Sequence, residues 1–335
     1  MNDQRNGGIA WTDFTSNPIR YRNAAGEHVW ACVKVSPGCA HCYSATTAQR
    51  FDRGTDYNAA EMAKLTPFLD EKELRTLLTS KKISGQRVFP YDMTDLFGEW
   101  VPFELIDRWF AVMALRPDVT FQILTKRQER MREYFSTRRR YHVQDAIDYG
   151  ESSWLSDFLG ERAAPLMSDW PLPNVWLGVS VENQETADQR IPALLNTPAA
   201  VRFVSYEPAI APIDFFNLSA VNLNGFGAGY FSGLHRTAVS RHLDWVIVGG
   251  ESGPGARPFD IEWARSTVRQ CWAAGVPVFV KQLGSVACSA DNSTYVGNEI
   301  TQRLDARMKL KDRKGGDPSE WPEDLRVREF PAVSR

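Results

Sequence analysis

The sequence contains no long apolar run. No stretch of its 335 residues approaches the roughly 20 consecutive apolar residues that a membrane-spanning helix needs. The start, Met1 to Gly8, has no apolar segment of the kind found in secretory signal peptides. The overall content of 43% hydrophobic and 24% charged residues is that of a globular protein. We therefore expect a cytoplasmic protein with no membrane partner.

The sequence also lacks a net charge of either sign. Lys and Arg number 39 and Asp and Glu number 41, which gives a formal net charge of −2. A chain without a basic field has no long-range attraction for nucleic acid, so any such contact must come from a local patch.

Several catalytic motifs are absent. With five histidines and no H-E-x-x-H, a zincin-type hydrolase is disfavoured. The glycine-rich run that begins at Gly249 lacks the G-K-[ST] ending of a phosphate-binding P-loop. The sequence shows no recognisable arrangement of a Ser-His-Asp catalytic triad. It also shows no internal repeat.

Cysteine is scarce, but it is concentrated in one place. Three of the five cysteines, Cys32, Cys39 and Cys42, are spaced C-x6-C-x2-C. Thiols this close in one loop favour a metal site over a disulfide framework. Iron–sulfur clusters are usually held by four thiolates, so three would leave one iron open for a ligand and make the site catalytic. Two alternatives stay open: a structural Cys3His zinc site completed by His28 or His41, and buried thiols without a metal.

The rest of the chain alternates between strand and helix patterns. Short Val-, Ile- and Phe-rich strands are expected at 28–35, 87–91, 120–125, 174–181, 201–205, 244–249 and 276–280. Helices are expected after Tyr43 and at 59–80, 103–116, 126–142, 184–196 and 261–274. About seven strands separated by helices predict an α/β fold, a full or partial (β/α) TIM-type barrel in a single domain over residues 1–335. The expected additions are insertions at about 143–173 and 215–242 and a C-terminal extension at about 285–335.

Polar residues cluster directly after these strands, where the ligand-binding rim of a β/α barrel forms. They are Asp92, Thr94 and Asp95; Thr125, Lys126 and Arg127; Ser180, Glu182 and Asn183; Ser205 and Glu207; Glu251 and Ser252; Lys281 and Gln282. One such position would only mark the start of a loop, but recurrence after six strands predicts a binding rim.

Three of these segments have two interpretations each. Gly249-Gly250-Glu251 lets the backbone approach a ligand closely, or it is a glycine-rich turn with a solvated carboxylate. Ser180 and Glu182 share one side of a strand and could bind a ligand, or they form a strand end followed by a helix N-cap at Asn183. The Arg-rich helix 126–142, with aromatic residues interleaved, could track a phosphate backbone, or it is a solvated helix.

The motifs together resemble a known family. The blocks are Val35-Ser-Pro-Gly-Cys39-Ala-His-Cys42-Tyr43, Leu124-Thr-Lys-Arg127, Gly178-Val-Ser-Val-Glu-Asn183, Phe203-Val-Ser-Tyr-Glu-Pro208, Val246 to Arg257 and Phe279-Val-Lys-Gln282. They resemble a phage-associated three-cysteine-motif family that is itself similar to radical S-adenosylmethionine (SAM) enzymes. The resemblance covers the chain from about Trp11 to Pro331.

The resemblance implies a 4Fe–4S cluster on Cys32, Cys39 and Cys42, on a barrel of the radical SAM kind. An electron donor would reduce the cluster, SAM bound to the open iron would be cleaved to a 5′-deoxyadenosyl radical, and that radical would abstract hydrogen from a substrate. The implied SAM contacts are Asp92, Thr94, Ser180, Glu182, Asn183, Gly249, Gly250 and Glu251. Two features depart from radical SAM enzymes: the first cysteine gap is six rather than three, and Gly249-Gly250-Glu251 lies on a late strand instead of the second.

The substrate side is the least defined part of this expectation. The candidate residues are Thr125, Lys126, Arg127, Glu207, Arg257, Lys281 and Gln282. The Arg-rich helix and the phage association favour a nucleic acid or a nucleotide as substrate. The alternative function is a non-catalytic nucleic-acid-binding protein whose three thiols and a histidine hold a structural zinc ion. The sequence does not define an oligomeric state.

Overall fold

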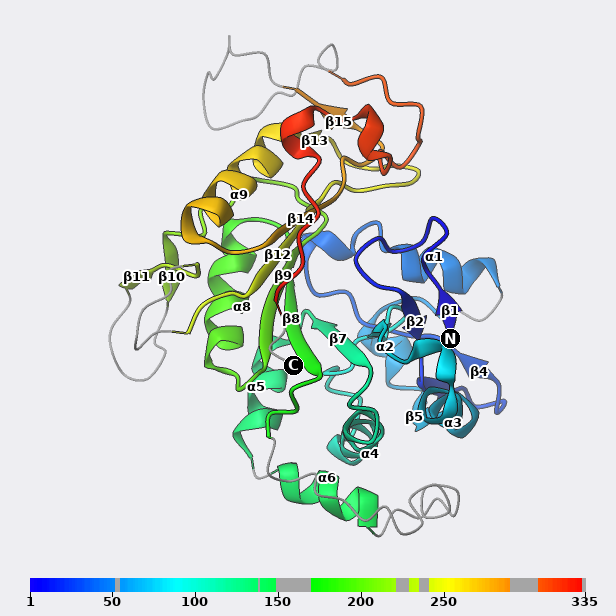
Figure 1. Cartoon of the computed structure of the whole chain (residues 1–335). Coiled ribbons are helices and arrows are strands. Elements are labelled where there is room, and N and C mark those ends of the chain that lie inside the picture. Colours follow the sequence, from blue (N-terminus) through cyan, green and yellow to red (C-terminus); the bar gives the residue numbers. More distant parts are fainter. Residues whose placement is uncertain are drawn as a thin grey trace. The chain divides into compact units, whose positions relative to one another are not determined.

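The chain folds into two compact units with mixed α/β structure (Figure 1). In the computed structural model, the described residues are 1–51, 55–137, 139–148, 170–220, 229–234, 241–289 and 307–332. The first unit comprises Met1–Gly178 and Asn196–Val201, and the second comprises Val179–Leu195 and Arg202–Arg335. The single domain expected over residues 1–335 stays a prediction.

The first unit is built on a mostly parallel sheet. Its strands follow the order β1 (Asn2–Asp3), β2 (Phe14–Ser16), β6 (Arg87–Pro90), β7 (Thr120–Thr125) and β8 (Val175–Val181). β2, β6 and β7 pair in parallel, and β1 pairs antiparallel with β2. A smaller antiparallel sheet has the order β4 (His28–Val29), β3 (Ile19–Arg22) and β5 (Thr66–Leu69). The strand expected at 28–35 is therefore much shorter than the pattern predicted.

The helices of the first unit follow from their apolar faces. They are α1 (Tyr43–Arg50), α2 (Ala59–Met62), α3 (Glu71–Thr79), α4 (Phe103–Ala114), α5 (Gln128–Ser136) and α6 (Arg139–Asp148). Short 3-10 turns occur at η1 (Pro37–Cys39) and η2 (Lys81–Ile83). In α4, Trp109, Phe110 and Met113 are fully buried, and α4 packs against α3 and α6. These contacts form part of the apolar core of the first unit.

One helix expected from periodicity is wrong. The segment 59–80 is divided into α2, β5 and α3, because β5 pairs along its whole length with β3. Pro67 lies inside β5, and a proline there would have broken a continuous helix. Asp70 then starts α3 by accepting hydrogen bonds from the backbone N–H groups of Lys72 and Glu73.

The second unit continues the parallel arrangement. After the end of β8, the strand order is β9 (Val201–Tyr206), β12 (Trp245–Gly249) and β14 (Val278–Gln282), with β12 parallel to both neighbours. The helices are α8 (Gln184–Asn196) and α9 (Ile261–Ala274), and α9 packs on β12 and β14 (Figure 1). Gly275 ends α9 in the left-handed conformation, with φ of 67°.

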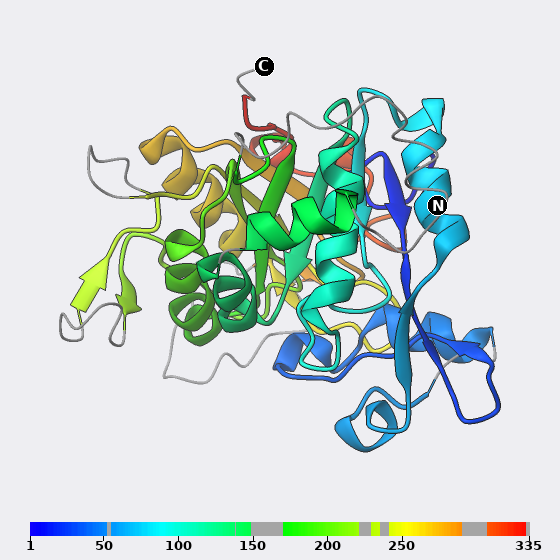
Figure 2. The same cartoon turned by 90° about the horizontal axis from the view of Figure 1, so that it is seen from below.

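The described residues of the second unit also form two small strand pairs and two short 3-10 turns. β10 (Leu218–Ala220) and β11 (Gly229–Phe231) form an antiparallel hairpin, drawn in yellow-green in Figure 2. β13 (Phe259–Asp260) pairs in parallel with β15 (Ala287–Cys288). Two 3-10 turns, η5 (Pro318–Glu320) and η6 (Glu323–Leu325), lie in the C-terminal segment.

The alternation predicted from the sequence is confirmed for every strand from β6 to β14 that the pattern marked and for α4, α8 and α9. The finer expectation, a full or partial TIM-type barrel, stays a prediction. Much of the expected additions, at 149–169, 221–228, 235–240, 290–306 and 333–335, lies outside the described residues. Among the helices described, none is both long enough and apolar enough to cross a membrane.

The C-terminal segment extends the edge of β14. The N–H of Val280 donates to the carbonyl of Val327, and the N–H of Glu329 donates to the carbonyl of Val278. The ring of Phe330 lies 5.2 Å from that of Trp245 and 5.3 Å from that of Phe279, measured between centroids. The segment thus covers a strand edge that would otherwise present unpaired backbone groups.

We predict that Phe330→Ala lowers the free energy of unfolding by about 2–3 kcal/mol, less than the usual loss for a fully buried Phe. The reason is the loss of its aromatic contacts with Trp245 and Phe279. Urea unfolding followed by tryptophan fluorescence measures the change. Glu323→Ala, an exposed change in the same segment, should stay within about 0.5 kcal/mol of the wild type. Equal unfolding midpoints for wild type and Phe330→Ala would contradict the prediction.

Candidate functional site

The three neighbouring cysteines lie on a loop of the first unit that precedes α1. The N–H of Cys39 donates to the carbonyl of Ser36 at 2.9 Å and closes the turn at Pro37–Cys39. Cys42 is the N-cap residue of α1, so the helix expected after Tyr43 is confirmed. The helix dipole at this end favours negative charge, which suits a thiolate.

Two of these thiols pack on a small apolar cluster. Ala48, Tyr57 and Met93 form its buried part, and Cys32 and Cys42 lie partly buried against it. Burial raises the pKa of the Cys32 thiol to about 12, and Asp95, Cys42 and Cys39 add to this effect, while the Arg127 guanidinium opposes it.

The segment after β6 is tied to the start of α1. Tyr43 Oη donates to the carbonyl of Asp92 at 2.9 Å and lies 3.2 Å from its carboxylate Oδ2. The Asn17 amide donates to Asp92 Oδ1. Burial raises the pKa of Asp92, against the lowering effect of these hydrogen bonds. Ser44 and Tyr57 hydroxyls both donate to the carbonyl of Met93 at 3.1 Å.

Thr94 is part of a separate hydrogen-bonded chain. Its hydroxyl lies 2.7 Å from Tyr21 Oη, which also accepts from Trp100 Nε1 at 2.7 Å. The structure therefore brings the predicted residues Asp92 and Thr94 next to partners that the sequence analysis did not mark. Asn17, Tyr21, Tyr57 and Trp100 carry no motif, and only their three-dimensional neighbours identify them.

Asp95 contacts the last residue of β7 and the two residues that follow it. Its Oδ1 accepts from the Thr125 hydroxyl at 2.6 Å, and its Oδ2 accepts from the backbone N–H of Lys126 at 2.9 Å. The Arg127 guanidinium lies 3.2 Å from the same Oδ2 and 3.0 Å from Glu99 Oε2. The residues at the ends of β6 and β7 therefore contact one another, while their role in a binding rim stays a prediction.

The cysteine loop contains the sulfur donors that an iron–sulfur cluster needs, but these side chains are not arranged around a common metal position. Within the parts of the chain that the structure describes, no group of three His, Cys, Asp or Glu side chains is arranged to hold a metal ion. Three partly exposed thiols from one loop are nevertheless the donors that iron–sulfur clusters take. The His28 ring packs on Phe68 with centroids 4.7 Å apart.

In the second unit, Glu182 forms a buried ion pair with Arg190. Its side chain is 0% exposed and lies 3.2 Å from Arg190 Nη1, whose side chain is 5% exposed. The same Nη1 donates to the carbonyl of Ser180. Asn183 Oδ1 accepts from the N–H of Thr186 at 3.0 Å, so the N-cap interpretation of Asn183 is confirmed. Ser180 Oγ donates to the carbonyl of Glu207 at 3.2 Å.

The paired glycines after β12 face their own chain. A Cβ on Gly250 would lie 2.5 Å from the carbonyl oxygen of Leu283 and 2.8 Å from the Phe259 ring, so any larger residue would clash. Glu251 is 7% exposed and binds Arg257 through both carboxylate oxygens, at 2.7 and 3.0 Å. The close contact of Gly250 in this structure is with its own chain, at Leu283 and Phe259, and the approach to a ligand expected from the sequence stays a prediction.

The remaining predicted residues of the second unit also pair with one another. The Lys281 ammonium forms an ion pair with Glu207, and the Gln282 amide donates to the carbonyl of Gly250 at 2.8 Å. Because β9, β12 and β14 are parallel neighbours, the strand ends that carry these residues meet at one edge of the sheet. These polar residues thus lie together within this unit, and a ligand-binding role for them stays a prediction.

The Arg-rich segment is divided between α5 and α6, and many of its arginines contact protein groups. Arg130 donates to the carbonyl of Val101, and Arg132 pairs with Glu129. Arg139 pairs with Asp107, which is 4% exposed. Arg138 lies outside the described residues. These contacts reduce the charge that the segment could offer to a phosphate backbone.

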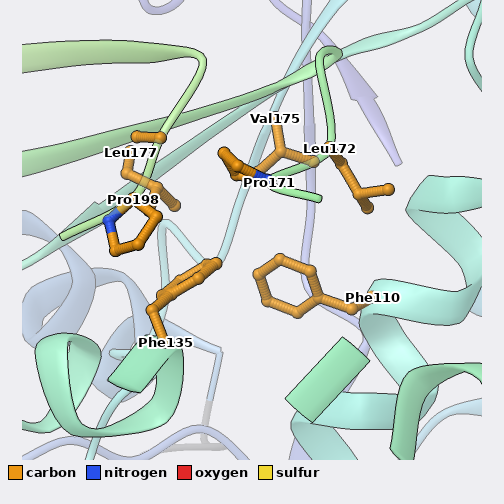
Figure 3. A pocket seen from close by; sticks show the side chains of 8 residues that line it. Phe110, Phe135, Pro171, Leu172, Val175, Leu177 and Pro198 are labelled. Carbon is orange, nitrogen blue, oxygen red and sulfur yellow. The ribbon is translucent and has the colours of Figure 1, made fainter. Parts of the chain in front are cut away.

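One apolar hollow of the first unit is too small to be a substrate site. It has about 150 Å³ of empty space, part of it open to solvent, but leaves no room for a water molecule. In Figure 3, the rings of Phe110 and Phe135 lie opposite Pro171 and Pro198, and Leu172, Val175 and Leu177 complete the labelled lining. We regard it as a packing defect of the core.

Comparison with protein families gives one finding. A family described as "Protein of unknown function (DUF5131)" matches residues 6–315. Comparisons with curated proteins and with solved structures gave no match.

We predict that Arg190→Met lowers the free energy of unfolding by about 3–5 kcal/mol, because it leaves the carboxylate of Glu182 buried without its counter-charge. Chemical denaturation measures the loss.

The matched control is Arg265→Met. Arg265 pairs with Glu262 and Asp324 at the surface, where ion pairs contribute about 0–1 kcal/mol. Similar losses for the two variants would show that Glu182 does not depend on Arg190.

Proposed function

We propose that this chain, which belongs to the DUF5131 family, is an iron–sulfur enzyme of the radical SAM kind on a full or partial (β/α) barrel. The observation that carries the proposal is the loop with Cys32, Cys39 and Cys42, three partly buried free cysteines within eleven residues. When bound, the cluster with SAM would supply a one-electron cleavage that generates a radical able to abstract hydrogen.

The three cysteines would hold the cluster through their sulfur atoms. Loading requires each thiol to lose its proton, and for Cys32 the metal must overcome a pKa of about 12. The apolar cluster of Ala48, Tyr57 and Met93 would keep water from one side of the sulfur atoms.

Asp92 is the proposed acceptor for the ammonium group of SAM. Its Oδ2 lies 3.2 Å from the hydroxyl of Tyr43, the residue that follows Cys42, so the carboxylate is fixed near the cysteine loop. The roles in SAM binding predicted for Thr94, Ser180, Glu182, Asn183 and Gly249 to Glu251 stay predictions. For Glu182 and Glu251, such a role would compete with their arginine partners.

The substrate and the electron donor belong to the same proposal. A nucleic acid or nucleotide substrate is supported by the basic character of residues 126–142 and by the phage-associated resemblance. Thr125, Lys126, Arg127, Glu207, Arg257, Lys281 and Gln282 stay the predicted substrate residues. A one-electron reductant is required as partner.

The test is anaerobic metal and sulfide analysis followed by an assay for SAM cleavage. We expect about four iron and four sulfide ions per wild-type chain. We also expect release of 5′-deoxyadenosine in the presence of SAM and dithionite. Cys39→Ala should lose the cluster and at least 99% of the product, because one of three ligands is removed.

The matched control is Cys288→Ala, which removes a buried thiol that lies outside the loop. This variant should keep its iron and its product. Colourless protein with one zinc per chain would reject the proposal in favour of a structural zinc site. Loss of product in both variants would show that the cysteine loop is not the specific site.

A further inference from the structure

The peptide bond that follows Val33 is held from both sides. The carbonyl of Val33 accepts from Arg127 Nη2 at 2.9 Å, and the N–H of Lys34 donates to the carbonyl of Tyr57 at 3.3 Å. Both groups belong to the same planar peptide unit, so the two hydrogen bonds fix its orientation. This peptide lies one residue after Cys32 and therefore sets the direction in which the loop leaves that cysteine.

Each of the three guanidinium nitrogens of Arg127 donates a hydrogen bond to another group of the protein. Its side chain is 5% exposed, Nη1 pairs with Asp95 and Nε pairs with Glu99. The Trp100 ring lies 4.4 Å from the guanidinium carbon and covers its face. A planar guanidinium can serve two carboxylates and a carbonyl at once, whereas the single ammonium of a lysine lacks this fork geometry.

We propose that Arg127 is a positioning residue for the cysteine loop, which fixes Cys32 relative to Cys39 and Cys42 and holds a permanent positive charge next to the residue that follows Cys32. This role differs from the substrate contact expected from the sequence. The inference depends on the proposed function in one respect only, namely that the loop binds an iron–sulfur cluster.

The charge has a consequence separate from the geometry. The carbonyl of Val33 accepts from Arg127 Nη2 and lies 3.8 Å from Cys32 Sγ, so the guanidinium charge is held near that sulfur atom. Net charge near an iron–sulfur cluster is one determinant of its reduction potential. A nearby cation stabilises the more negative, reduced form, so removing it should make reduction harder.

Two arginine variants separate the two effects. Arg127→Lys keeps the positive charge and loses the fork, whereas Arg127→Met loses both. Glu99→Gln weakens the clamp from an exposed position and should fold normally. The matched control is Arg130→Met, because Arg130 also donates to a backbone carbonyl, that of Val101, and lies 4.3 Å from an aromatic ring centroid, but does not contact the cysteine loop through these groups.

The first readout is amide hydrogen exchange in the metal-free full-length protein. The reporters are the N–H groups of Lys34, Cys39 and Ala40, which donate hydrogen bonds within the first unit. In Arg127→Met and Arg127→Lys these amides should exchange on the order of tenfold faster, as expected for loss of a charged hydrogen bond. Glu99→Gln should show a smaller increase, and Arg130→Met should match the wild type.

The second readout is cluster content and reduction potential after anaerobic reconstitution. Arg127→Met should hold less iron and sulfide than the wild type, and its remaining cluster should have a lower potential. Arg127→Lys should share the reduced content but keep a potential close to that of the wild type. Arg130→Met should be unchanged in both respects.

The outcomes distinguish this inference from the proposed function. Wild-type loading, together with unchanged exchange and potential in the Arg127 variants, overturns the positioning role and leaves the iron–sulfur proposal intact. Failure of the wild type to load iron overturns the iron–sulfur proposal and the electrostatic role, while hydrogen exchange still decides whether Arg127 positions the loop. If Arg127→Met does not fold by circular dichroism, Arg127→Lys and Glu99→Gln decide the question.

Discussion

The ion pair between Arg127 and Asp95 links the first unit's sheet to its cysteine loop. Burying two charges is unfavourable unless both are paired and their remaining polar atoms are hydrogen-bonded. Here Asp95 also accepts from Thr125 and from the N–H of Lys126, and Arg127 also donates to Val33. Because every partner belongs to a strand end or to the loop, the buried charges connect β6 and β7 to the segment that carries Cys32.

The second unit uses the same type of contact at its own strand ends. Arg190 joins Glu182 to the carbonyl of Ser180, and Arg257 holds both oxygens of Glu251. Charged residues after parallel strands are usual in ligand sites, because the strand ends meet at one edge. In this protein, the same position also favours charged residues that hold neighbouring loops together. A polar residue after a strand is therefore evidence of a rim but not by itself of a ligand contact.

The strands and long helices could be predicted because their signal is local. Runs such as Trp245–Gly249 and the apolar face of Phe103–Ala114 carry enough information in their own residues. The segment 59–80 could not be predicted in the same way, because the pairing of β5 with β3 depends on residues far away in the chain. The partners of the candidate residues were inaccessible for the same reason: nothing local in the sequence indicates that Arg127 reaches Val33.

The structure also bears on the choice between ligands and inert thiols. Cys271 is 0% exposed within α9, as expected for a thiol that packs as a small apolar side chain. The loop cysteines differ from it, because each of these residues is only partly buried. Cys32 Sγ has a weak contact with the carbonyl of Val33 at 3.8 Å, and Cys39 Sγ lies 3.9 Å from Ser36 Oγ. Partly buried cysteines whose sulfur atoms make only long contacts suit residues that bind a group supplied from outside the chain. This contrast supports the metal-binding interpretation of the loop more directly than the spacing of its cysteines does.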